Sequence, residues 1–156
     1  MQIYLISVGN KMPDWVSAGY HEYARRMPRE CQLRLIELPP AHRSKTTNLE
    51  RAIEEEGQRI IKAIPNNCDI IALDVNGKNH STESLANLME TWLHSGRDIA
   101  LLIGGADGLS KSCLSQANSN WSLSNLTFPH PLVRVIVAEQ VYRAWSLMNN
   151  HPYHRA

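Results

Sequence analysis

In the stretch Asp98-Ile-Ala-Leu-Leu-Ile-Gly-Gly-Ala-Asp-Gly108, an apolar run is followed directly by a glycine-rich turn. Five apolar residues, Ile99-Ala-Leu-Leu-Ile103, bounded by glycine predict a buried strand. Glycines such as Gly104 and Gly105 allow the backbone to approach a ligand where a Cβ atom would clash. The turn after this strand is therefore one candidate wall of a binding pocket.

A second polar turn, Leu123 to Phe128, leads through Pro129-His130-Pro131 into a long apolar helix. The two turns are expected to form two walls of one pocket, to which the end of an earlier strand at Leu73 also contributes. Small side chains and backbone groups of this kind suit an adenosyl ligand, since apolar walls enclose the adenine and backbone N–H and C=O groups read its edge. A simple helix-entry turn is the alternative for residues 123–128.

The glycine turn does not fit the common phosphate-binding patterns. A dinucleotide fingerprint needs G-x-G-x-x-G after the first strand of a βαβ unit, whereas here I-G-G-x-x-G follows a late strand. A Walker A loop requires Gly-Lys-Ser/Thr, which does not follow Gly108. These mismatches argue against a turn that cradles phosphate.

Strand and helix patterns alternate along the whole chain. Strands are predicted at residues 2–8, 32–38, 69–74, 99–103 and 121–123. Helices are predicted from Met12-Pro13-Asp14, from a capping box at Thr47-x-x-Glu50, from Ser81 or Thr82 to a C-cap at Gly96, over residues 110–118 and over residues 131–148. The order predicts one α/β domain over residues 1–156, with a mainly parallel sheet flanked by helices and ligand loops at the carboxyl ends of the strands.

Two helical faces carry specific expectations. In the second helix, Leu49, Ile53, Ile60 and Ile64 form the apolar stripe, and the run Glu54-Glu55-Glu56 is expected on the solvent face.

In the terminal helix the predicted apolar face is Leu132, Val135, Ile136 and Met148. Glu139 falls inside that stripe and needs a partner, for which Arg143, four residues on, is the natural choice. A structural ion pair and a role in catalysis both remain open for Glu139.

Composition excludes several classes of protein. The chain of 156 residues has a formal net charge of +1, which argues against a generic polyanion binder and against DNA binding. Three widely spaced cysteines form no CxxC metal pair, and no metal site is expected. The apolar runs are far shorter than the ~20 residues of a membrane span. We expect a cytoplasmic protein without a membrane partner.

Two basic segments are candidate phosphate contacts. Arg25 and Arg26 close the first helix, where cations also complement the helix dipole. His42, Arg43 and Lys45 lie in a turn-rich segment after Pro39-Pro40, and the alternative there is a solvated mobile loop.

Several long motifs resemble one bacterial enzyme family. They are Val8-Gly9-x-Lys11, Leu73-Asp74-x-x-Gly77-Lys78, Ile103-Gly104-Gly105-x-x-Gly108, Ser122-Leu-Ser-x-Leu-Thr-x-Pro-His-Pro-Leu-Val-Arg-Val135, Ala138-Glu139-Gln-x-Tyr142-Arg143-Ala144-Trp145 and Asn150-His-Pro-Tyr-His154. Together they resemble the pseudouridine N3-methyltransferases of bacterial large-subunit (23S) ribosomal RNA, small enzymes of the SPOUT superfamily. The resemblance implies an α/β knot, in which the chain after Trp121 passes through an earlier loop as a deep trefoil knot.

The same resemblance implies a cofactor and a partner. S-adenosyl-L-methionine would be the methyl donor, and the terminal helix would help to build a homodimer. The implied cofactor contacts are Leu73, Ile103, Gly104, Gly105, Leu123, Ser124, Asn125, Leu126, Thr127 and Phe128.

Methyl transfer from a sulfonium requires positioning and a deprotonated nucleophile, but no metal. The chain offers Arg143, Tyr153 and His154 as candidate catalytic residues, with Tyr153 able to stack on an extruded base. His151 and Arg155 are assigned to RNA, together with Arg25, Arg26, His42, Arg43 and Lys45.

Because a net charge of +1 offers few phosphate contacts, we expect recognition of a prefolded ribosomal surface on the assembled large subunit. A SPOUT methyltransferase for transfer RNA and a non-catalytic ribosome-binding module remain as alternatives.

Overall fold

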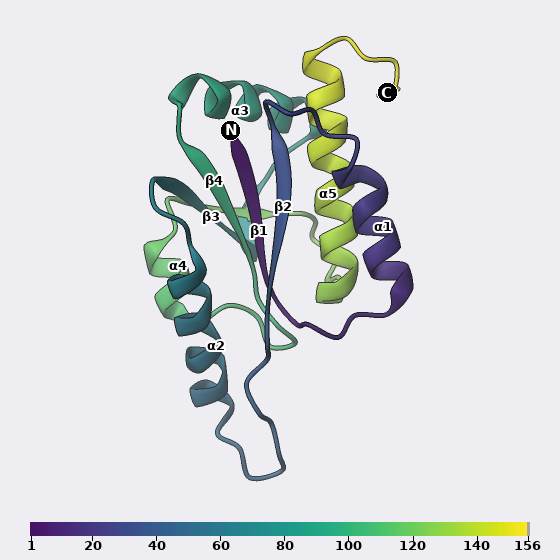
Figure 1. Ribbon diagram of the computed structural model, residues 1–156. Coiled ribbons are helices and arrows are strands. Elements are labelled where there is room, and N and C mark those ends of the chain that lie inside the picture. The colour runs from purple at the N-terminus through teal and green to yellow at the C-terminus, as the bar shows by residue number, and fades with distance from the viewer. Residues whose placement is uncertain (156) are drawn as a thin grey trace.

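The computed structural model describes residues 1–155 as a single five-stranded parallel sheet with helices on both faces (Figure 1). The strands are β1 (Gln2–Val8), β2 (Gln32–Leu38), β3 (Cys68–Asn79), β4 (Asp98–Ile103) and β5 (Ser119–Ser122). The helices are α1 (Asp14–Ala24), α2 (Leu49–Ala63), α3 (Thr82–Ser95), α4 (Lys111–Gln116) and α5 (His130–Met148). The order across the sheet is β2-β1-β4-β3-β5, with every pair parallel, so the predicted α/β class is confirmed.

Strand β4 lies at the centre of the sheet and separates two cores. Ile99, Leu101 and Ile103 face the larger core under α1, α3 and α5, whereas Ala100 and Leu102 face the smaller core under α2 and α4. This alternation follows from the period of two in a strand, and burial on both faces explains the unbroken apolar run. The α2–α4 layer and the α1–α5 layer lie on opposite sides of the sheet in Figure 1.

Four local predictions differ from the structure. Asn48, not Thr47, caps α2, because its side chain accepts from the Arg51 N–H. Strand β3 runs on to Asn79, beyond its predicted end at residue 74, and its pairing with β5 is irregular between Leu73 and Lys78. Helix α4 is shorter than predicted, and β5 begins and ends earlier. These differences concern the ends of elements and do not change the topology.

The predicted faces of two helices were wrong in part. Glu56, placed on the solvent face with its acidic neighbours, is 2% exposed, while Leu49 is 49% exposed. The core face of α5 consists of Val137, Ala138, Val141, Tyr142 and Ala144.

The stripe of α5 predicted to be its core face, Leu132, Val135 and Ile136, is only half-buried. A helix that is apolar on more than one side needs a second surface to cover it.

Arg134 anchors the first half of α5 to the sheet. Its side chain is 1% exposed, and the guanidinium donates to Ser7 Oγ (3.2 Å), to the Gly9 carbonyl (2.6 Å) and to Glu37 Oε2 (2.6 Å). Ser7 and Gly9 lie at the carboxyl end of β1, and Glu37 lies at the corresponding end of β2. The start of α5 is thereby fixed over the edge of the sheet where the strand ends meet.

No helix within residues 1–155 is both long and apolar enough to cross a bilayer.

Replacing Arg134 by Met should lower the free energy of unfolding by about 2–3 kcal/mol, because the Ser7 hydroxyl and the Gly9 carbonyl lose their buried donor. The matched control is Arg97→Met, which removes an ion pair to Asp69 whose partners are both more than a third exposed, and which should cost less than about 1 kcal/mol. Urea unfolding of both variants measures the difference, and equal costs would contradict the anchoring role.

Candidate functional site

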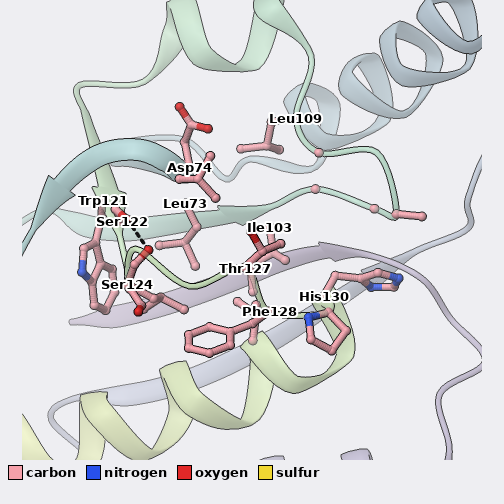
Figure 2. A pocket seen from close by; sticks show the side chains of 18 of the residues that line it. Leu73, Asp74, Ile103, Leu109, Trp121, Ser122, Ser124, Thr127, Phe128 and His130 are labelled. Atoms are coloured by element: carbon pink, nitrogen blue, oxygen red, sulfur yellow. Dashed lines mark hydrogen bonds between the residues drawn. The ribbon is translucent and has the colours of Figure 1, made fainter.

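A cavity of about 740 Å³ opens at the carboxyl ends of β3, β4 and β5 (Figure 2). We call it the main cavity. Its walls are the end of β3 at Leu73, the glycine turn over residues 103–109, and the loop after β5 over residues 121–130. The two turns singled out in the sequence therefore do form two walls of one pocket. Its size lies in the range of ~300–1,000 Å³ that is usual for small-molecule sites.

Nearly all residues predicted to contact the cofactor line the main cavity. The exception is Asn125, which faces β3 and accepts a hydrogen bond from Asn79 Nδ2 at 3.3 Å. The predicted residues that do line the cavity are Leu73, Ile103, Gly104, Gly105, Leu123, Ser124, Leu126, Thr127 and Phe128.

Ser124 holds the loop after β5 in shape. The Ser122 hydroxyl donates to the Ser124 carbonyl at 3.1 Å, and the Leu126 N–H donates to Ser124 Oγ at 3.0 Å, as Figure 2 shows for the first pair. These short-range bonds replace secondary structure where the chain bends toward α5. Leu126, 69% exposed, lies at the rim of the cavity. The hydrogen bonds of Ser122 and Ser124 thus fix the loop that forms one wall of the main cavity.

The glycine at position 104 is required by the turn itself. A Cβ atom there would lie 2.3 Å from the backbone carbon of Gly108 and 2.6 Å from the Leu109 nitrogen. The close approach that requires glycine here is thus made within the turn, and the close approach of a ligand to Gly104 stays a prediction. Any side chain at this position would open the turn that forms the cavity wall.

The glycine turn packs against the buried side chain of Glu56 in α2. Oε2 of this buried carboxylate accepts from the Ala41 N–H (3.0 Å) and from Arg43 Nη1 (2.7 Å), and Oε1 accepts from Nη2 (3.1 Å). A Cβ atom on Gly105 would lie 3.2 Å from Glu56 Oε1. Arg43 also donates from Nε to Asp107 at 3.0 Å. One buried ion pair thus joins α2, the loop after β2 and the glycine turn.

This arrangement changes the role assigned to Arg43. Arg43 was predicted to contact RNA phosphate, but its guanidinium binds two carboxylates, and the pKa of Arg43 is raised chiefly by the hydrogen bonds to Glu56. Its neighbours His42 and Lys45 are exposed. Arg43 therefore fixes this loop against Glu56 and Asp107, while the side chains of His42 and Lys45 remain exposed to solvent.

A second cluster lies along the second half of α5 and the tail that follows it. Tyr153 donates from its hydroxyl to Glu139 Oε1 at 2.9 Å, and Arg143 donates from Nε to the same oxygen at 2.8 Å. The Arg143 guanidinium lies over the Tyr153 ring, 4.8 Å from its centroid. His154 Nδ1 lies 3.5 Å from Arg143 Nη1, and its Nε2 lies 3.7 Å from Glu83. Glu139 thus has the Arg143 partner expected for it, and it also positions Tyr153.

Burial and the hydrogen bond to Glu139 raise the pKa of Tyr153 to about 12. The phenol is therefore neutral at physiological pH, and within one chain its hydroxyl is a donor to Glu139. In this arrangement Tyr153 is suited to orienting or stacking on a ligand rather than to removing a proton.

The predicted cations divide between the two ends of the molecule. Arg26 lies at the tail end, 5.6 Å from the Tyr142 ring centroid and 6.0 Å from that of Tyr153. Both Arg25 and Arg26 pair with Glu22. His151 and Arg155 are exposed at the same end.

Within one chain, the predicted catalytic residues Arg143, Tyr153 and His154 do not line the main cavity. His130 borders the cavity at the first residue of α5, and the tail begins after Met148, the last residue of that helix. At 1.5 Å per residue the helix spans roughly 27 Å, and the tail folds back along it as far as Glu139, near the middle of the helix, to which Tyr153 donates. The predicted cofactor contacts and the predicted catalytic residues are therefore not brought together by a single chain.

Three functional candidates escaped the sequence analysis, namely Glu56, His130 and Arg134. A signal existed for Arg134, since it is the only charged residue in the apolar run from Leu132 to Val137. The sequence contains no signal for the burial of Glu56, because nothing in the run distinguishes it from the two acidic residues before it, which are not buried. Burial and the nearby Arg134 guanidinium hold the pKa of His130 below its ordinary value.

Among residues 1–155, no three His, Cys, Asp or Glu side chains are grouped so as to hold a metal ion.

Known proteins resemble this chain over its whole length. The sequence model of a family described as "Predicted SPOUT methyltransferase" matches residues 1–154. A protein of Methylococcus capsulatus named ribosomal RNA large subunit methyltransferase H is 57% identical over 155 residues, which cover 99% of this chain and 100% of that protein. Proteins of the same name from Thioalkalivibrio sulfidiphilus and Marinomonas are 56% and 53% identical, again over 99% of this chain and 99% and 100% of their own lengths.

Among solved structures, a probable methylase family protein from Haemophilus influenzae superposes with a TM-score of 0.53 at 14% identity, over 99% of this chain and 70% of that one. At so low an identity this likeness concerns the fold alone.

The raised pKa of Tyr153 predicts a late-titrating phenol. The difference in absorbance near 295 nm between the wild type and Tyr153→Phe should show one tyrosine with a midpoint near 12, because burial and Glu139 favour its protonated form. Since the folded pKa lies above the unfolded value, the associated stability is full below pH ~10 and is lost as the pH rises toward 12. A midpoint near 10 for that residue would contradict the bond to Glu139.

Proposed function

The chain belongs to the SPOUT methyltransferase family and is a methyltransferase, and from that premise we propose that it methylates N3 of a pseudouridine in the 23S RNA of the large ribosomal subunit. The observation that carries the substrate class is that relatives more than half identical over their full length bear the name ribosomal RNA large subunit methyltransferase H. The position on the base follows from the family that the motifs resemble. Neither transfer RNA as a substrate nor a non-catalytic ribosome-binding role is favoured by these relatives.

S-adenosyl-L-methionine is the proposed methyl donor, and it supplies a methyl group activated on a sulfonium. The main cavity fits such a group, since Leu73, Ile103 and Leu109 provide apolar surface for an adenine. Three of the five residues from Gly104 to Gly108 are glycines that line the cavity without a side chain, which leaves their peptide groups to read a ligand's edge. No metal is needed for this transfer.

The active enzyme is proposed to be a homodimer in which each site uses both chains. Arg143, Tyr153 and His154 lie along the second half of α5 and do not line the main cavity of their own chain. The half-buried apolar stripe of α5, with Leu132 and Ile136, is left for a partner to cover. A two-fold pairing along α5 would bring the tail of one chain to the cavity of the other.

RNA recognition is proposed to depend on a prefolded surface. Arg25, Arg26 and Arg43 are paired with carboxylates of their own chain, so they add little net positive charge to the surface. His42, Lys45, His151 and Arg155 remain exposed, at opposite ends of the chain. Such sparse cations are suited to a ribosomal subunit of fixed shape and not to naked RNA or DNA.

The chain is further proposed to form a trefoil knot and to act in the cytoplasm. The chain leaves β5 at one edge of the sheet and returns in α5, which packs between α1 and α3, and this return is consistent with threading after Trp121. A substrate in ribosomes implies a cytoplasmic enzyme without a membrane partner.

Assembled ribosomes containing the large subunit should be methylated efficiently, whereas protein-free 23S RNA should be methylated slowly, because naked RNA lacks the fixed surface. Mass spectrometry of nucleosides from both reactions measures N3-methylpseudouridine directly, and rRNA from cells with and without the protein provides the comparison in vivo. Equal rates on the two substrates would refute surface recognition, and absence of the modified nucleoside from both would refute the proposed function.

The two-chain site predicts complementation between two inactive variants. Thr127→Trp should fill the main cavity from its rim, and Tyr153→Ala combined with His154→Ala should remove the tail side chains while leaving cofactor affinity nearly unchanged. Each homodimer should be inactive, but a re-equilibrated mixture should recover roughly a quarter of wild-type activity, since half of the dimers are mixed and one of their two sites is intact.

Light scattering on the wild type at micromolar concentration should show a dimer. A monomer, or a mixture that recovers nothing although mass spectrometry shows mixed dimers, would overturn the shared site.

A further inference from the structure

A second cavity, of about 430 Å³, lies over the carboxyl ends of β1 and β2. Its floor and sides are Val8, Met12 and Pro40, with Asn10 and Lys11 at the surface. We call it the adjoining cavity, because it lies on the other side of the glycine turn from the main cavity.

The two cavities share a thin wall. Only Gly105, Ala106 and His130 line both of them. Apart from the imidazole, no side chain larger than a methyl group stands on this wall. In Figure 2 the His130 ring projects from the start of α5 toward the glycine turn. Because group transfer requires the reacting atoms of two ligands to approach to about 3–3.5 Å, the acceptor must bind beside the donor.

The polar groups of the adjoining cavity lack partners. Asn10 and Lys11 form no side-chain hydrogen bond to the described part of the chain, and neither do the ring nitrogens of His130. Nδ1 of that ring is fully buried and unsatisfied. A buried polar atom without a partner is uncommon and costs free energy. The charge of Glu56 is meanwhile neutralised by Arg43, so the floor does not repel an anionic ligand.

We infer that the adjoining cavity receives the target base, a uracil-type base extruded from its RNA loop, with the His130 ring against its imide edge and Lys11 beside a flanking phosphate. This inference rests on the proposed function. Apolar surfaces such as Met12 and Pro40 suit the faces of a base, and the exposed amide of Asn10 suits its polar edge. Enzymes that modify a base within folded nucleic acid require such a pocket. The lowered pKa of His130 leaves the imidazole neutral, so that it can share a hydrogen bond with an uncharged imide.

The first test blocks the cavity from its rim. Asn10→Trp should lower methylation of ribosomes by about 100-fold while changing the cofactor Kd, measured by calorimetry, less than twofold. The matched control is Asn66→Trp, the same substitution at an exposed position in the loop between α2 and β3, which should behave as wild type. Wild-type turnover in a folded Asn10→Trp variant overturns the inference, and so does a loss of cofactor affinity, which would assign the cavity to the cofactor.

The second test does not depend on catalysis. With methyl-labelled methionine, the Met12 signal should shift when pseudouridine 5′-monophosphate is added to the protein saturated with S-adenosylhomocysteine, while the signal of the fully buried Met89 stays in place. A shift of Met12 on addition of S-adenosylhomocysteine alone, or none on addition of the nucleotide, contradicts the assignment. If the wild type failed to methylate any ribosomal RNA but Met12 still responded to the nucleotide, the proposed function would fail and the base site would stand.

Discussion

The buried guanidinium of Arg134 fixes the relation between the terminal helix and the sheet. It satisfies a hydroxyl and a carbonyl at the end of β1 and pairs with Glu37 at the end of β2. A charge so deeply buried is tolerated only when its donors are matched, so α5 has one allowed depth and rotation at this point. His130 lies one turn earlier and borders both cavities. The walls built from the start of α5 therefore depend on this one side chain.

The glycine turn is constrained from two sides in a similar way. Its own backbone leaves no room for a Cβ atom at Gly104, and the Glu56 carboxylate approaches Gly105 from below. Glu56 is in turn held by Arg43, which also reaches Asp107 on the turn. The wall between the cavities is thus thin because glycine is required at these positions. It is held in place by the ion pairs of Arg43 with Glu56 and Asp107. A thin and firm wall suits the transfer of a small group between two bound ligands.

Helix α5 separates the chemistry into two parts. Its first residues border the cavities, whereas its second half holds the cluster of Glu139, Arg143 and Tyr153. None of the three cluster residues lines either cavity of its own chain. The proposed pairing of two chains would bring the two parts together and would also cover the half-buried stripe on α5. The same helix thereby explains why so small a chain would function as a dimer.

The sequence by itself determined the alternation of strands and helices, the buried strand at residues 99–103, and the pairing of the two turns around one pocket. These features depend on local periodicity and on turn residues, which act within a few positions along the chain. All the predicted cofactor contacts except Asn125 line the main cavity, because strand ends in a parallel sheet meet at one edge.

Only the tertiary structure decided which face of α5 enters the core, that Glu56 is buried beside two acids that are not, and that Arg43 binds carboxylates instead of remaining free. Each of these depends on partners far away in the sequence, at Ser7, Ala41 and Asp107, and no local pattern encodes which partner will be near. In a helix that is apolar on two sides, the sequence does not indicate which side is buried. In a run of three acidic residues, it does not indicate which of the three is buried. The side that is buried is set by what packs against it.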